Sequence, residues 1–111
     1  MAETQLLKGV LEGCVLEVIA QEEIYGYELI QRLKQYGFST IIGGTIYPLL
    51  QKLEKRGLIA GVMRASPDGP DRKYFQLTED GRVYLSDFWQ QWKELVEKVS
   101  QINGGKYDEN T

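Results

Sequence analysis

The chain has 111 residues, a net charge of −3, one cysteine and no histidine. Its length fits one domain with a small appendage, and a single cysteine excludes an intrachain disulfide bond. We find no secretory signal and no apolar run long enough to cross a membrane, so we expect a cytoplasmic protein. We also find no phosphate-binding glycine loop and no cluster of metal ligands, and therefore expect no catalysis, no cofactor and no metal.

The charge is distributed unevenly along the chain. Residues 31–75 contain eight basic and three acidic residues, a net charge of +5, whereas the remainder contains five basic and 13 acidic ones, a net charge of −8. The local field, rather than the total charge, decides which face of a protein meets a polyanion. The middle segment is therefore compatible with nucleic-acid binding, although unevenly charged solvated helix faces produce the same pattern.

Two helices are predicted in the first third of the chain. Apolar residues at three- and four-residue spacing indicate a helix from Leu6 to Ile19. After a restart at Tyr25 and Gly26, a second short helix is expected to end near Tyr36. Residues 38–44 are expected to form a connector.

A third helix is predicted over residues 45–56. With Thr45 as the N-cap, Pro48 falls in the first turn, where its missing N–H has no intrahelical partner to lose. Gly57 fits the C′ position, and Lys55 complements the negative end of the helix dipole. A helix with sharp ends and a polar first turn has the shape that enters a DNA major groove. Its buried face is expected to consist of Ile46, Leu49, Leu50 and Leu53, and its outward face of Tyr47, Gln51, Lys52 and Lys55.

A β-hairpin and a last helix complete the predicted elements. Residues 58–65 and 72–77 read as strands around a turn at 66–71. Thr78 then caps a helix that continues to Ile102. This order predicts a mainly α (α+β) fold, a winged helix-turn-helix with a two-stranded wing and an added C-terminal dimerisation helix. We expect a DNA-binding domain at 1–78, the dimerisation helix at 79–102 and a disordered tail at 103–111.

The apolar residues of the last helix repeat at seven-residue spacing, which is typical of a helix–helix seam. Part of this stripe must pack on its own domain, but the stripe is longer than local packing needs. We therefore expect a homodimer, in which two recognition helices would match two half-sites about one helical turn apart. The predicted interface residues are Leu85, Phe88, Trp89, Trp92, Leu95, Val96 and Val99.

Several segments, taken together and in this order, resemble the PadR family of bacterial transcriptional regulators in its short form with a single C-terminal helix. They are residues 25–30 (YGYELI), 44–50 (GTIYPLL), 53–59 (LEKRGLI) and 72–78 (RKYFQLT), with Gly81. The resemblance implies a homodimeric repressor that binds an inverted-repeat operator on double-stranded DNA. In some members a small aromatic or cationic effector releases the DNA, and Trp92 matches the tryptophan that flanks a pore at their dimer interface.

The wing departs from the family pattern. The family usually places an arginine or a Gly-Arg pair before the Arg-Lys-Tyr run, whereas here Asp71 precedes Arg72 and Asp68 lies nearby. The phosphate contact of the wing is therefore expected to depend on Arg72 and Lys73. The candidate DNA-binding residues are Thr45, Tyr47, Gln51, Lys52, Lys55, Arg72 and Lys73.

Each candidate has an ordinary structural alternative. Gln51 can pair with adenine and Lys52 with guanine or phosphate, or both belong to a solvated helix face. Thr45 can offer its backbone N–H and hydroxyl to a phosphate, or only cap its helix. Trp89 and Trp92 can stack an effector or form dimer core. An acidic wing and a low isoelectric point also leave open a protein-interaction module. A further alternative is a protein that acts mainly as a small-molecule sensor.

Overall fold

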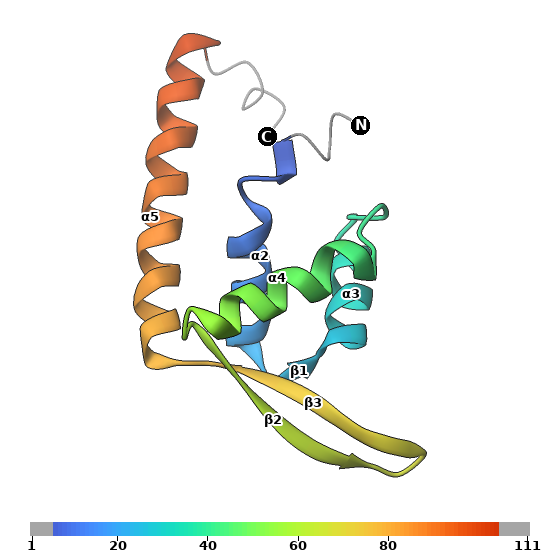
Figure 1. Cartoon of the computed structure of the whole chain (residues 1–111). Coiled ribbons are helices and arrows are strands. Elements are labelled where there is room, and N and C mark those ends of the chain that lie inside the picture. The colour runs from blue at the N-terminus through green and yellow to red at the C-terminus, as the bar shows by residue number, and fades with distance from the viewer. Residues whose placement is uncertain (1–5, 105–111) are drawn as a thin grey trace.

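Helix α2 (Leu11–Gln21) lies at the centre of the molecule, between α5 on one side and α3 on the other (Figure 1). The computed structural model describes residues 6–104. Buried side chains of α2 join apolar side chains of α3, α4, the sheet and α5 in one core. Within residues 6–104 this core contains no buried polar side chain, so α2 holds the other elements by apolar packing.

The first helix is shorter than expected. Leu6 and Leu7 are helical, residues 8–10 form a turn, and α2 begins at Leu11. The Val10 N–H donates to the Leu7 carbonyl at 2.8 Å. Gly9 lies in this turn, and glycine in a helix interior costs about 1 kcal/mol relative to alanine. The prediction of one continuous helix from Leu6 is therefore wrong at its N-terminal end.

A short strand, β1 (Ile24–Tyr25), precedes helix α3 (Gly26–Gln35). It pairs antiparallel with β3, which places Ile24 opposite Phe75. The sheet therefore has three strands, in the order β1-β3-β2, and not only the two expected in the wing. Two residues are too few to show the alternation that reveals a strand in a sequence.

Helix α4 (Gly43–Lys55) begins two residues earlier than expected. Ile42 is its N-cap, and the Thr45 N–H donates to the Ile42 carbonyl at 3.0 Å. The prediction of Thr45 as the N-cap is therefore wrong, and Pro48 lies in the second turn. The Ile42 side chain has no hydrogen-bond acceptor that could signal the true start.

The C-terminal end of α4 confirms the prediction. Gly57 has φ +78°, and its N–H donates to the Glu54 carbonyl at 2.9 Å. The Leu58 N–H donates to the Leu53 carbonyl at 3.0 Å, which completes a Schellman motif. On the predicted inner face of α4, Ile46, Leu50 and Leu53 are buried, and Leu49 is half-buried against the core.

Strands β2 (Ile59–Ser66) and β3 (Gly69–Leu77) form the wing hairpin; β2 lies one residue later than predicted, and β3 begins three residues earlier. Ser66 lies opposite Gly69, so the turn between the strands is only two residues long. Pro70 lies inside β3, at a point where β1 does not cover the strand. Proline is tolerated along such an unpaired edge, because no ladder hydrogen bond is lost there.

Helix α5 (Glu79–Ile102) begins and ends as predicted. The Thr78 side chain accepts a hydrogen bond from the Gly81 N–H at 2.9 Å and donates one to the Gly57 carbonyl at 2.7 Å. Figure 1 shows that the C-terminal half of α5 extends past α4. Asn103 and Gly104 form a turn, and the rest of the predicted tail lies outside the described residues. The division at residues 78 and 79 into two functional parts stays a prediction.

We predict that Gly81→Ala lowers the free energy of unfolding by about 1–3 kcal/mol, the usual cost of overpacking. A Cβ at Gly81 would lie 2.1 Å from the Leu58 carbonyl oxygen, so backbone would have to move. Gly69→Ala is the control, because a Cβ there meets no atom within 4 Å. Chemical denaturation of both variants measures the difference, and equal stabilities would contradict the close approach of α5 to residue 58.

Candidate nucleic-acid interface

The outward face of α4 is polar and accessible. The predicted residues Tyr47, Gln51, Lys52 and Lys55 are all exposed, as is Thr45. Within residues 6–104, neither Lys52 nor Lys55 makes an ion pair. Both ammonium groups are thus available to a polyanion. The Thr45 N–H is taken by the Ile42 carbonyl, which leaves the Thr45 hydroxyl as the group that can reach a ligand.

Tyr47 has a second role, because its ring packs on the neighbouring helix α3. A Cβ built on Gly26 would lie 2.4 Å from the Tyr47 Cε1 atom, and one on Gly43 would lie 3.0 Å from its Cε2 atom. The ring therefore covers the N-terminus of α3 at a site where only glycine fits. This contact explains the glycine of the YGYELI segment, and it sets how α3 and α4 meet.

Arg72 and Lys73 lie on opposite faces of the wing. The Lys73 ammonium forms an ion pair with the Glu54 carboxylate of α4 at 2.8 Å, whereas the Arg72 guanidinium lies 4.6 Å from the centre of the Tyr25 ring on β1. Tyr25 in turn meets Tyr74 edge to face, with ring centres 5.3 Å apart. Lys73 therefore ties the wing to α4, and Arg72 is the wing cation that has no carboxylate partner within residues 6–104.

Glu23, in the connection between α2 and β1, contacts both strands of the wing. Its carboxylate accepts hydrogen bonds from Arg64 on β2, one of them at 2.8 Å, and from Gln76 on β3, also at 2.8 Å. The Arg64 bond, supported by the Gln76 bond, lowers the pKa of Glu23 below its ordinary value. The carboxylate is therefore charged at neutral pH, and it neutralises Arg64. Contacts across such a sequence distance leave no local signal in the sequence.

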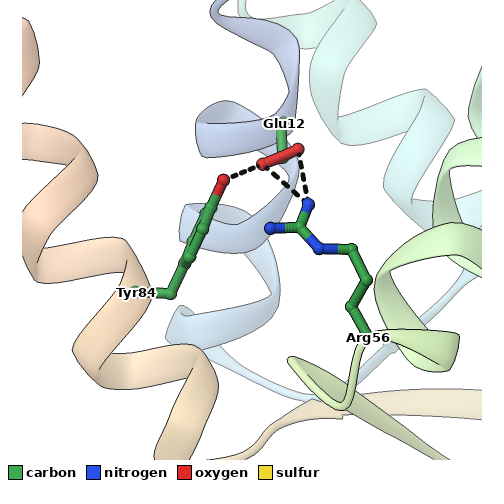
Figure 2. Close-up of polar contacts among 3 residues, drawn as sticks. All are labelled: Glu12, Arg56 and Tyr84. Carbon is green, nitrogen blue, oxygen red and sulfur yellow. Dashed lines mark hydrogen bonds and ion pairs between the residues drawn. The ribbon is translucent and has the colours of Figure 1, made fainter.

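A second polar cluster joins three helices, and Figure 2 shows how its members lie. The Arg56 Nη1 atom, at the C-cap of α4, lies 3.2 Å and 3.4 Å from the two carboxylate oxygens of Glu12 on α2. The Tyr84 hydroxyl of α5 donates to the same carboxylate, and the Arg56 guanidinium carbon is 4.9 Å from the centre of the Tyr84 ring. Tyr84 and Glu12 both raise the pKa of Arg56.

These ion pairs halve the basic charge that residues 31–75 offer to a partner. Four of the eight basic side chains are paired with carboxylates, three of which lie outside the segment. Within the described part of the chain, four basic residues of the segment form no ion pair. They are Lys34, Lys52, Lys55 and Arg72.

The predicted interface residues of α5 separate into two groups. Leu85 is only 6% exposed, and the Phe88 ring occupies the space where Gly13 would carry a Cβ, 2.1 Å away. Trp89 donates its indole N–H to the Glu17 carboxylate of α2 at 2.9 Å. These three side chains pack within their own chain. Val96 is half-buried. The exposed apolar residues in the C-terminal half of the helix, called the α5 stripe below, are Trp92, Leu95, Val99 and Ile102.

An open apolar hollow of about 580 Å³ lies beside the α5 stripe. Its walls include Val10 and Cys14 on one side and Trp89, Trp92 and Leu95 on the other. Burial raises the pKa of the Cys14 thiol, which favours the unreactive protonated form and agrees with a packing role. Trp92 is 41% exposed, so its ring is accessible from the hollow.

The fold and this polar helix face define a winged helix-turn-helix protein. The comparisons with known proteins place it more narrowly. Residues 15–87 match the transcriptional regulator PadR-like family. The chain therefore belongs to this family, whose members are transcriptional regulators that bind DNA and are not enzymes.

Two solved structures and one curated relative agree with this assignment. A Streptococcus transcriptional regulator is 65% identical, with a TM-score of 0.82 over 91% of this chain and 99% of that one. A PadR-like transcriptional regulator from Bacillus cereus is 47% identical, with a TM-score of 0.80 over 88% and 95%. A transcriptional regulator from Mycobacterium tuberculosis is 33% identical over 77% of this chain and 78% of its own length.

Neither a membrane span nor a metal site is found in the part of the chain that the structure describes. No helix within residues 6–104 combines the length and apolar character needed to cross a bilayer. Among the same residues, no three histidine, cysteine, aspartate or glutamate side chains gather closely enough to hold a metal ion.

Proposed function

We propose that the chain is a homodimeric repressor that occupies an inverted-repeat operator in the cytoplasm. The observation that carries this proposal is the outward face of α4, where exposed Gln51 lies beside Lys52 and Lys55, whose ammonium groups form no ion pair with any residue that the structure describes. A polar helix face with free cations is what the major groove of DNA accommodates. The wing would add phosphate contacts through Arg72, while Lys73 holds the wing against α4.

Lys52 tests the DNA contact directly. We predict that Lys52→Ala weakens binding to a duplex from the protein's own promoter and lowers the slope of log K against log salt concentration by about one, the value for one lost phosphate contact. Lys93→Ala is the control, because it removes the same charge from an exposed position on α5. Fluorescence anisotropy at several salt concentrations measures both variants.

The outcome would also separate the rival functions. If Lys52→Ala and Lys93→Ala both bind like the wild type, α4 is not the reading helix. If the wild-type protein shows no salt-sensitive DNA binding and instead copurifies with a protein, the interaction module is favoured.

The dimer is supported by the α5 stripe. Its four exposed members belong to the C-terminal half of α5. This half of the helix extends past α4 (Figure 1). A contiguous apolar patch on a small protein usually marks an interaction site. A two-fold pairing of this patch would bury it and present two copies of α4 to one duplex. Leu85 lies in the core of its own chain, so we leave it out of the proposed interface.

Two matched variants of α5 test this pairing. Leu95 is 54% exposed and Val83 is 67% exposed, but only Leu95 belongs to the α5 stripe. We predict that Leu95→Glu raises the dissociation constant of the dimer by roughly 100-fold, since burying an unpaired carboxylate costs about 3 kcal/mol. Val83→Glu is expected to leave the dimer intact. Sedimentation velocity measures both, and equal behaviour of the two variants would contradict the proposed interface.

We further propose that a planar aromatic or cationic effector enters the hollow beside Trp92. Its walls are apolar and aromatic, and the acidic residue Glu94 lines the neighbouring part of the same surface. Aromatic faces attract both planar rings and cations. Trp92 is the residue that an effector would contact first, since Trp89 is already held by Glu17.

Tryptophan fluorescence tests the effector site, with ethidium as the planar cationic probe. We predict that ethidium quenches the wild-type emission and that Trp92→Leu loses most of this quenching while the Trp89 emission stays. In the matched variant Val83→Leu, ethidium is expected to quench the tryptophan emission as strongly as in the wild type. Absence of quenching in the wild-type protein would leave Trp92 as part of the dimer core only.

A further inference from the structure

The Glu12–Arg56–Tyr84 cluster connects the end of the recognition helix to the helix that carries the proposed dimer contacts. Arg56 is the C-cap residue of α4, Tyr84 lies in the second turn of α5, and Glu12 lies on α2 between them. Figure 2 shows the three side chains converging from these three helices. The cluster thus spans the two elements whose relative position a dimeric DNA reader must control.

The contacts in this cluster are directional. The Glu12 carboxylate accepts hydrogen bonds from the Arg56 Nη1 atom at 3.2 Å and 3.4 Å. It accepts another from the Tyr84 hydroxyl. The Glu12 side chain is 19% exposed, so solvent screens this pair less than a surface ion pair. The guanidinium carbon also lies 4.9 Å from the centre of the Tyr84 ring, a cation–π contact. Charged hydrogen bonds fix orientation as well as distance.

Other contacts hold each helix in the fold without the cluster. The Phe88 ring over Gly13 and the bond from Trp89 to Glu17 keep α5 on α2. Buried side chains such as Ile46 and Leu53 keep α4 in the core. Removing one hydrogen bond of the cluster would therefore leave the chain folded and change mainly how firmly the end of α4 is held relative to α5.

We propose that Glu12, Arg56 and Tyr84 form a positioning clamp that sets the separation of the two recognition helices in the dimer. The proposal rests on the function proposed above, because the separation matters only if α5 joins two copies and α4 reads DNA. With the clamp intact, the dimer accepts one spacing between half-sites. With the clamp opened, α4 can rotate by a small angle, and the dimer tolerates other spacings. The three residues are positioning residues and do not themselves contact DNA.

The test uses operators with altered spacing. Duplexes that the wild-type protein selects from a random pool supply the operator, and the distance between its half-sites is then changed by one base pair. We expect the wild type to lose affinity by roughly tenfold on this change, the scale of one unfavourable base-pair step. In Tyr84→Phe and Glu12→Gln we expect the loss to shrink to about threefold or less. Glu22→Gln, which removes the exposed Arg32–Glu22 ion pair at 3.0 Å, is the control and should keep the wild-type ratio.

The decisive readout is the ratio between the affinity for the selected operator and the affinity for the operator with altered spacing. A purely structural role of the cluster would lower the melting temperature of the variants and leave this ratio unchanged. If Tyr84→Phe and Glu12→Gln both show the same affinity ratio as the wild type, the proposal of a clamp is refuted, whatever the thermal stability of the variants. A wild-type protein that binds but ignores the spacing would also overturn it, while leaving the proposed DNA binding intact. A wild-type protein that selects no duplex would refute the proposed function, and the clamp with it.

Discussion

The apolar packing of α2 is the constraint on which the rest of the structure depends. This helix contacts α5 along one flank and the helix-turn-helix along the other, and Val15 and Leu16 are completely buried. Gly13 leaves room for the Phe88 ring, so α5 approaches α2 closely. Because α2 supports α5 and the helix-turn-helix alike, contacts within a single chain decide the position of α4 relative to α5. Neither a partner chain nor DNA is needed for this arrangement.

The fold also redistributes the charge of the chain. The basic segment looks strongly positive in the sequence, yet Arg32, Arg56 and Arg64 are neutralised by carboxylates of the acidic N-terminal part. These pairs serve to orient the elements, and surface pairs of this kind contribute little to stability. The cations that have no such partner within residues 6–104 include Lys52 and Lys55 on α4. Two of the four basic residues of the segment that keep no carboxylate partner there thus lie on the helix that we propose reads DNA.

Local patterns predicted much of this architecture, and long-range contacts account for what they missed. The buried face of α4, its stop at Gly57 and the cap at Thr78 follow from periodicity and from capping chemistry. The start of α4 differs from the prediction because its N-cap, Ile42, has no side-chain acceptor, whereas Thr45 has the typical capping hydroxyl. Strand β1 is too short to show a period.

The heptads of α5 do not distinguish packing on α2 from packing on a second chain, so Leu85 and Leu95 look alike in the sequence but differ in burial. The Glu12–Arg56–Tyr84 cluster joins residues far apart in the chain and has no local sequence signal.

The central claim is that two copies, joined through α5, place two α4 helices in successive grooves of one duplex. Hydroxyl-radical footprinting of the wild-type protein on its own promoter tests this claim most directly. The account predicts two protected stretches related by two-fold symmetry, with centres about one helical turn, or a multiple of it, apart. A single protected stretch, or protection without symmetry, would contradict it.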